Sequence, residues 1–315
     1  MRRVLCLVLL LLMLAGLCGC GEAEQSAEDG RLQIVTTVFP AYDFARQIAG
    51  ERAAVTLLLP PGAEAHSFEP TAKDMARIRS AALFFCNGGE SEAWAEELLD
   101  DGEQIRCLRM LDCVEALEEE VKEGMQEIRE HEHGEEEEGP EYDEHVWTSP
   151  VNAEKICEAL CGELCEIDPE GESGYRARLD AYTAQLEALD SAFRETVAQG
   201  THRTLVFADR FPVRYFVEEY GLSYFAAFPG CAEDTEPSAR TVAFLIDRVR
   251  EERLPAVLYI EFSNRKMADM ICEDTGCKEL LFHSCHNVSA DELRQGVSYL
   301  SLMQGNVSAL KEALG

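Results

Sequence analysis

The sequence predicts an α/β protein with two lobes, each a mainly parallel sheet with flanking helices, joined by one long rigid helix. Short β-branched runs alternate with helical patterns in both halves of the chain, which is typical of parallel sheets covered by helices. A helical pattern of about six turns separates the two halves. With 315 residues, 46% of them apolar, the chain can also bury sizeable cores.

The first 30 residues are predicted to be an export signal and a tether. Two arginines precede a leucine-rich stretch at residues 7–17, and Cys18-Gly19-Cys20 follows, which is the pattern of a bacterial lipoprotein signal. We therefore expect residues 1–19 to be removed, Cys20 to carry a lipid anchor and residues 20–30 to form a flexible tether. The protein is then extracytoplasmic, on the outer face of the cell membrane. An ordinary signal peptide that contains cysteines is the alternative.

The N-terminal lobe, residues 31–170, begins with alternating strand and helix patterns. Prolines and glycines at residues 60–62 and 87–89 end two of its strands. In a parallel sheet, ligands gather at the loops beyond the carboxyl ends of the strands, so we expect a site there. The expected strands are residues 32–38, 55–59, 82–86 and 105–108, and the expected helices are residues 42–49 and 71–80.

Residues 115–144 form an acidic segment within this lobe. The segment holds fifteen acidic residues and few apolar ones after Met125. Such a composition cannot bury enough surface to order itself, so we expect a mobile loop. His131 and His133 are candidates for weak metal binding in this loop, and a solvated linker is the alternative.

The linking helix is placed at residues 171–200, and the C-terminal lobe covers residues 201–315. Apolar residues spaced by threes and fours define the helix. Two lobes joined in this way leave one cleft between them. The C-terminal lobe repeats the alternation, with expected strands at 204–207, 223–227, 256–260 and 279–282 and expected helices at 213–220, 238–252, 266–275 and 290–304.

The charge of the chain excludes one class of partner. Lysine and arginine number 28 against 60 aspartates and glutamates, for a formal net charge of -32. This charge repels nucleic acids and anionic membrane surfaces at long range and favours a cationic ligand. No nucleic-acid partner is expected.

The cysteines are numerous, but the sequence does not define their pairing. Cys157, Cys161 and Cys165 recur every four residues, which indicates a stripe of small residues in the core more than a metal or disulfide site. Cys272 and Cys277 could form a disulfide in an oxidising compartment or remain thiols in an anaerobic one.

Four of the seven histidines fall at strand ends or in loops. They are His66, His145, His283 and His286. Neutral imidazole suits zinc, and three or four imidazoles from separate loops would build a tetrahedral site. Any one of them alone is more typical of a surface or structural histidine, but their joint placement favours a metal site in the cleft.

Two motifs resemble the leading metal-ligand motifs of the zinc/manganese ABC-transporter substrate-binding lipoproteins, the cluster A-I metal-binding proteins. They are PGAEAHSFEP at residues 61–70 and DEHVWTSP at residues 143–150. The acidic loop before the second motif resembles the zinc-type members, and the long helix is similar to the family's interdomain helix. The resemblance covers residues 31–313. It implies that His66 and His145 bind Zn²⁺ rather than Mn²⁺, and that a monomer delivers the ion to a membrane permease.

The third family motif departs from the pattern at residues 205–211. Ala208 stands where the family has a histidine or glutamate ligand, and alanine cannot coordinate. Asp209 could substitute, although beside Arg210 it could equally form an ion pair or cap the next helix. Glu64, two residues before His66, is a further candidate ligand.

The fourth family position is an acidic residue in the loop after the last strand, where this chain has histidines. His283 and His286 together could replace the ligand missing at Ala208. The expected ligand set is therefore His66, His145, His283 and His286. Glu261, directly after a strand, is expected to orient a ligand imidazole.

The function implied is capture of Zn²⁺ outside the cell for an ABC transporter, without catalysis. A secreted zinc-dependent hydrolase is one alternative, because a carboxylate such as Glu64 beside zinc could activate water. The sequence contains no H-E-x-x-H helix, G-x-S-x-G elbow or P-loop in support of such an enzyme. A surface adhesin or metal buffer, which needs no transporter, is the other alternative.

Overall fold

The computed structural model describes residues 30–100, 105–126, 141–232 and 237–315. The export signal, the anchor Cys20 and the loop histidines His131 and His133 lie outside the described residues. By its internal contacts the chain divides into Met1–Arg31 and Leu32–Gly315, and the helices and strands of the described residues belong to the second unit. Within the described part of the chain, no helix is long and apolar enough to cross a membrane.

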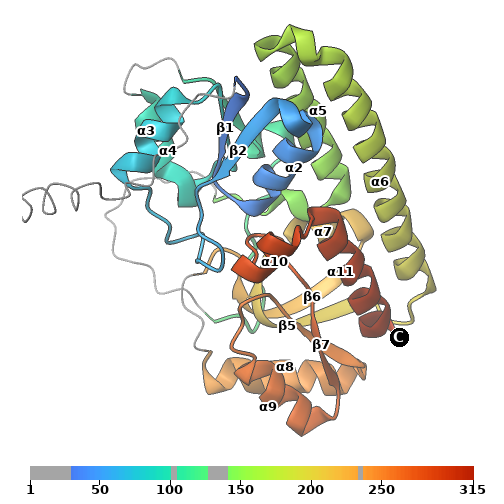
Figure 1. Ribbon diagram of the computed structural model, residues 1–315. Coiled ribbons are helices and arrows are strands. Elements are labelled where there is room, and N and C mark those ends of the chain that lie inside the picture. Colours follow the sequence, from blue (N-terminus) through green and yellow to red (C-terminus); the bar gives the residue numbers. More distant parts are fainter. Residues whose placement is uncertain (1–29, 101–104, 127–140, 233–236) are drawn as a thin grey trace, which may run out of the picture. The chain divides into compact units, whose positions relative to one another are not determined.

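The first sheet is parallel, as the sequence predicts, and its four strands lie in the order β2-β1-β3-β4. Helices α3 and α4 lie on one side of it and α2 and α5 on the other (Figure 1). The strands are β1 (Leu32–Thr36), β2 (Ala53–Leu57), β3 (Leu83–Cys86) and β4 (Cys107–Arg109). The helices are α2 (Phe39–Ala49), α3 (Ala72–Ser80), α4 (Ala93–Asp100) and α5 (Pro150–Ile167).

Successive residues of these strands enter different cores, because side chains alternate between the two faces of a strand. Ile34 and Phe85 belong to the main core with α2 and α5, whereas Val35 and Phe84 pack with Ile78 of α3. All four residues of β3 are buried. A sheet covered on both faces requires such continuous apolar strands.

The second sheet repeats this arrangement, with parallel strands in the order β6-β5-β7-β8. Helices α8 and α9 cover one face and α11 covers the other (Figure 1). The strands are β5 (Thr204–Phe211), β6 (Ser223–Pro229), β7 (Ala256–Tyr259) and β8 (Lys278–Leu281). The helices are α7 (Arg214–Tyr220), α8 (Ala239–Glu252), α9 (Lys266–Thr275), α10 (Ala290–Gln295) and α11 (Tyr299–Leu314).

The long helix α6 (Glu172–Gln199) packs against both α5 and α11, so it contacts both lobes. Its buried side chains include Tyr182, Leu186 and Phe193. Arg178 donates hydrogen bonds to the carbonyls of Ile48 and Ala49 at 2.7 and 3.0 Å, which satisfies the end of α2. The two α/β lobes and the long helix predicted from the sequence are thus confirmed.

The single helix predicted at 290–304 is wrong, because the segment forms two helices. Gly296 ends α10 with φ +73°, a left-handed conformation that glycine adopts without strain. Ser298 then begins α11, and its side chain accepts a hydrogen bond from the Ser301 amide. Short 3-10 turns occur at Gly50–Arg52, Glu90–Glu92, Leu111–Cys113, Val146–Thr148 and Pro169–Gly171.

The cysteine stripe of α5 lies in the core as predicted, with Cys157 and Cys161 buried. The ten cysteines among the described residues are free. Cys272 and Cys277 have their Sγ atoms 3.3 Å apart, which is a thiol–thiol contact. These residues contribute apolar packing in their reduced form.

The expectation of a mobile loop over all of residues 115–144 is wrong at both ends of the segment. Glu118 pairs with Tyr142 in an antiparallel bridge. The amide of Gln126 donates to the Ala227 carbonyl at 2.8 Å, and Met125 is buried. Residues 115–126 therefore pack against the second sheet, whereas residues 127–140 lie outside the described part of the chain.

A turn after β3 supports the segment that carries His145. Glu92 accepts hydrogen bonds from the amides of Asn87 and Gly88 at 2.9 and 2.8 Å. The Asn87 side chain donates to the Glu144 carbonyl at 3.0 Å, and the Glu144 carboxylate accepts from both the amide and the hydroxyl of Ser91. The backbone on the N-terminal side of His145 is thus held by the turn.

The buried Glu92 predicts a pH dependence of stability. Burial, opposed by hydrogen bonds, raises the pKa of Glu92 from 4.5 to about 7. The folded protein keeps this proton between pH 4.5 and 7 while the unfolded chain loses it, so the stability that it contributes is lost as pH rises through this window. In metal-free protein, Glu92→Gln is expected to raise the free energy of unfolding at pH 8 by about 1–3 kcal/mol.

Urea unfolding at pH 4.5 and pH 8 measures this effect, because the glutamine oxygen can accept the same two amide hydrogen bonds and the difference should disappear near pH 4.5. A stability difference between parent and variant that is the same at both pH values would contradict the assignment of a raised pKa to Glu92.

Candidate metal centre

Three imidazoles converge between the two sheets. His66 follows β2, His145 precedes α5, and His286 follows β8. One ring nitrogen from each lies within 4.8 Å of the others. The ring centroids are 5.0 to 5.4 Å apart. The two residues of the leading motifs and one of the two C-terminal histidines are therefore brought together, with a spacing that one metal ion could bridge.

The loops that carry His66 and His286 are joined directly by Asn287. Its side-chain amide donates to the carbonyls of Pro60 and Ala63 at 2.8 and 2.9 Å. The amide of Gly62 donates to the Val288 carbonyl at 2.9 Å. Gly62 has φ +78°, so the turn before His66 uses a conformation that suits glycine. The two imidazoles are thus positioned by one set of hydrogen bonds.

His145 is buried, and Asp143 orients its ring. Asp143 Oδ1 lies 3.2 Å from His145 Nδ1 and accepts from the His145 amide at 2.8 Å. Burial lowers the pKa of His145, but Asp143, together with Glu144 and Glu119, raises it, and the net effect is a pKa above the ordinary value. A proton on Nδ1 leaves Nε2 free, and Nε2 makes no hydrogen bond with any described residue. A carboxylate behind an imidazole is the arrangement that orients metal ligands.

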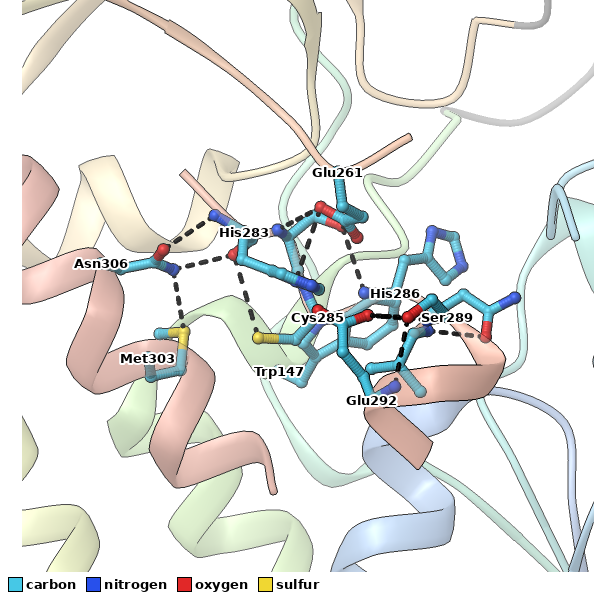
Figure 2. A network of polar contacts seen from close by, with 12 residues as sticks. Trp147, Glu261, His283, Cys285, His286, Ser289, Glu292, Met303 and Asn306 are labelled. Atoms are coloured by element: carbon cyan, nitrogen blue, oxygen red, sulfur yellow. Dashed lines mark hydrogen bonds and ion pairs between the residues drawn. The ribbon is translucent and has the colours of Figure 1, made fainter. Parts of the chain in front are cut away.

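His286 is positioned by the segment before it. Its amide donates to the Ser284 hydroxyl at 3.1 Å, and the Ser284 amide and hydroxyl donate to the Glu261 carboxylate. Trp147 donates from its indole to the Ser284 carbonyl at 2.8 Å and packs against the His286 ring, with centroids 5.0 Å apart. Figure 2 shows this network around Glu261 and His286.

His66 and His286 are kept neutral by their surroundings. Burial, together with the nearby His145 and Arg210, lowers the pKa of His66 to about 3. Burial, with His66 and His145, lowers the pKa of His286 well below its ordinary value. Neutral imidazoles offer lone pairs, so both rings are in the form that binds a metal ion at neutral pH.

His283 does not join the group, so the expected convergence of His283 and His286 does not occur. Asn306 of α11 binds the main chain of His283 on both sides, at 2.7 and 2.8 Å. The ring nitrogen Nδ1 accepts from the Cys285 amide at 2.9 Å and lies 3.5 Å from Glu261 (Figure 2). These contacts hold His283 within the C-terminal lobe.

The carboxylates proposed from the sequence also lie outside the three-histidine group. Glu64 pairs with Arg210 at 2.8 Å. Asp209 is buried and accepts from the Arg210 amide at 2.9 Å, beside the buried Ala208. Glu261 acts on the main chain of the His286 loop through Ser284.

A small cavity of about 30 Å³ is lined by the three histidines, together with Glu64, Arg210, Gly230 and Glu261. This volume is comparable with one water molecule. Beside it lies a larger cavity of about 440 Å³, lined by Asp209, Phe262 and Lys266 among others. The imidazoles thus face a space suited to a single ion.

Of the residues that support these ligands, only Glu261 was predicted from the sequence, and it acts through Ser284 on the main chain of the His286 loop. Asp143 and Trp147 lie two residues to either side of His145, within the motif DEHVWTSP. Their positions in this motif could have indicated that they support the ligand. Asn287 is adjacent to His286, but only the fold shows that it contacts Pro60. Cys231, which lies near His66 and Glu144, has no signal in the sequence beyond being a cysteine.

Comparisons with known proteins show the family of this chain. The family described as ZnuA, zinc-uptake complex component A, periplasmic, matches residues 34–313. The zinc-binding lipoprotein AdcA of Streptococcus pneumoniae is 32% identical over 308 residues, which cover 96% of this chain and 60% of that protein. The high-affinity zinc uptake system protein ZnuA of Bacillus subtilis is 31% identical over 309 residues, covering 96% of this chain and 94% of that protein.

A solved structure has the same fold. The crystal structure of the Zn(II)-bound ZnuA-like domain of Streptococcus pneumoniae AdcA is similar with a TM-score of 0.74 and 29% identity, covering 90% of this chain and 99% of that one. The chain spans about three fifths of the length of the full pneumococcal protein, since it covers 60% of it.

Gly230, directly after β6, is a position next to the metal centre where a side chain should destabilise the fold. A Cβ atom there would lie 2.9 Å from the Phe211 carbonyl, 3.2 Å from Asp143 Oδ2 and 3.3 Å from the His145 ring. Because the nearest of these atoms is backbone, Gly230→Ala is expected to lower the free energy of unfolding by about 1–3 kcal/mol. Chemical denaturation of metal-free protein measures the change.

Gly305→Ala is the matched control. Gly305 lies within α11, and a Cβ there meets no atom within 4 Å. This variant should gain about 0.5–1 kcal/mol from the better helix propensity of alanine. If both variants shifted the free energy of unfolding in the same direction, the lack of space for a side chain at Gly230 would be contradicted.

Proposed function

The chain belongs to the ZnuA family of zinc-uptake complex components, and from this membership we propose that it is the extracytoplasmic substrate-binding component of a zinc ABC transporter. The observation that carries the proposal is the group formed by His66, His145 and His286, whose ring nitrogens lie within 4.8 Å of one another. The zinc ion is cargo: the protein captures it and delivers it to a membrane permease.

The donor set favours zinc over manganese. Imidazole nitrogen suits Zn²⁺, whereas Mn²⁺ is better matched by oxygen ligands. Three histidine ligands leave a fourth position, which water or a carboxylate can fill in a tetrahedral zinc site. The nearby carboxylates of Glu64 and Glu261 are already paired, with Arg210 and Ser284 respectively. Water is therefore the proposed fourth ligand.

Capture depends on groups from both lobes. His66 and His145 come from the N-terminal lobe, and His286 comes from the loop after β8 in the C-terminal lobe. His66 and His286 need not lose a proton before they bind, whereas His145 exchanges any proton on Nε2 for the ion while Asp143 stabilises the ring. The formal net charge of -32 attracts the cation at long range.

The cellular setting is part of the proposal. The lipoprotein-type signal sequence before Cys20 supports a lipid anchor on the outer face of the cell membrane, and the pneumococcal relative is itself named a lipoprotein. We propose that the anchored protein acts as a monomer. A hydrolase is disfavoured because the ion pair with Arg210 occupies Glu64, the carboxylate that would have to activate water.

The ligand assignment predicts a ranking of histidine variants. Three substitutions should each weaken the affinity for Zn²⁺ by more than about 100-fold: His66→Ala, His145→Ala and His286→Ala. The loss should exceed the effect of residues that only orient a ligand, which contribute about 10–100-fold to metal affinity. His283→Ala and Asp209→Asn should stay within that lower range. Competition of metal-stripped protein with a chromophoric chelator measures the affinities.

His202→Ala serves as the matched control, because His202 belongs to no metal-binding group among the described residues. Its affinity should equal that of the parent. A loss for His283→Ala as large as that for His286→Ala, in a variant with the parent's circular dichroism, would restore His283 to the ligand set.

Deletion of residues 128–139 should leave tight zinc binding intact and remove weaker sites that His131 and His133 provide. The deletion must begin after Gln126, because Glu119, Met125 and Gln126 contact the C-terminal lobe. Calorimetry should find one tight site in both proteins and the weaker heats only in the parent. Loss of the tight site would place one of its ligands inside the deleted segment.

A further inference from the structure

A second group of metal-binding side chains shares His66 with the three-imidazole centre. One ligand atom each from His66, Glu144 and Cys231 lies within 4.8 Å of the other two. Imidazole, carboxylate and thiolate are all ligands of zinc, and thiolate in particular selects softer metal ions. The donor set of this group differs from that of three imidazoles, so it should favour different cations.

The three side chains are supported from both lobes. Cys231 follows β6, and its amide donates to Glu119 Oε1 at 3.0 Å. Glu144 is adjacent to His145, and its carboxylate accepts from the Ser91 amide at 2.8 Å. A Cβ on Gly89 would lie within 2.5 Å of Glu144 Oε1, so the turn after β3 fits closely around this carboxylate. Contacts with neighbouring segments therefore fix the positions of both Cys231 and Glu144.

The second group lies nearer the solvent than the first. Cys231 is only partly buried, whereas His145 and His286 are both buried. The second group also carries more negative charge. A carboxylate and a thiolate together balance the charge of a divalent cation, whereas three neutral imidazoles do not. Binding forms a metal–sulfur bond and releases the thiol proton to water, so no oxidant or reductant is needed.

We propose that His66, Glu144 and Cys231 form a second, thiolate-containing cation position that overlaps the three-imidazole centre and takes a soft divalent cation such as Cd²⁺. This inference builds on the proposed zinc function, since both positions use His66. Because His66 is shared, an ion held through Cys231 competes with zinc at the imidazoles.

The test measures modification of Cys231 itself. Metal-stripped, reduced protein is treated with iodoacetamide with and without one equivalent of Cd²⁺, and the modified peptides are quantified by mass spectrometry. Cd²⁺ should slow the alkylation of Cys231 by at least about tenfold, because a coordinated thiolate is a poor nucleophile. His66→Ala should abolish the protection. An equal rate of alkylation with and without Cd²⁺ would overturn the proposal.

His286→Ala separates coordination from shielding. This variant lacks the three-imidazole centre but retains the second group, so Cys231 should remain protected. If protection were lost in His286→Ala, shielding by an ion at the imidazoles would explain it, and the second position would be rejected.

A bound Co²⁺ ion gives a direct signature of the metal–sulfur bond. The near-ultraviolet charge-transfer band of thiolate-bound Co²⁺ should be absent in Cys231→Ser and retained in Cys113→Ser, a cysteine outside both groups. A band that is unchanged in Cys231→Ser would reject the second position. Zinc titration of the same variants keeps the two proposals distinct: tight zinc binding without Cd²⁺ protection leaves the transport function standing and removes only this inference.

Discussion

The indole of Trp147 connects the segments that carry His145 and His286, and the geometry of the centre depends on it. Its N–H donates to the Ser284 carbonyl at 2.8 Å, two residues before His286. Its ring packs against both His145 and His286, with centroid distances of 5.5 and 5.0 Å. Tyr299 of α11 in turn donates to the Trp147 carbonyl at 2.7 Å. A fully buried side chain with all its polar groups paired can position neighbouring rings precisely enough for coordination.

The surroundings of the three rings affect their protonation in two different ways. Asp143 stabilises a proton on the far side of the His145 ring, whereas His66 and His286 face each other and Arg210 in a buried space. Cationic neighbours and desolvation both disfavour imidazolium. A divalent ion would therefore replace a proton that the pocket already disfavours at two of its three rings, which reduces the competition between metal and acid.

Much of the fold and part of the site could be predicted from local sequence pattern. The alternation of strands and helices predicted both sheets. The motifs around His66 and His145 predicted two members of the centre, and the loop after the last strand predicted the third, His286, together with His283. The direction of His283 could not be predicted, because it depends on Asn306, which is 23 residues away in the chain and binds both sides of its main chain. The order of residues 115–126 depends on partners such as Tyr215, whose hydroxyl accepts from the Leu117 amide at 3.1 Å. Composition describes a segment alone and carries no information about such distant partners.

The continuous helix α6 has a consequence for how fast an ion can leave. Because α6 is one unbroken helix that packs against α5 in one lobe and α11 in the other, a change in the angle between the lobes would have to bend α6 or break its packing. Exchange of the ion must then come from the loops themselves, above all those that Asn287 joins near His66 and His286. We expect the dwell time of the ion to depend on how often these few hydrogen bonds break together. The dwell time of the ion, and with it the rate of transfer to a membrane partner, could then change through substitutions in a loop while the two sheets and α6 stay the same.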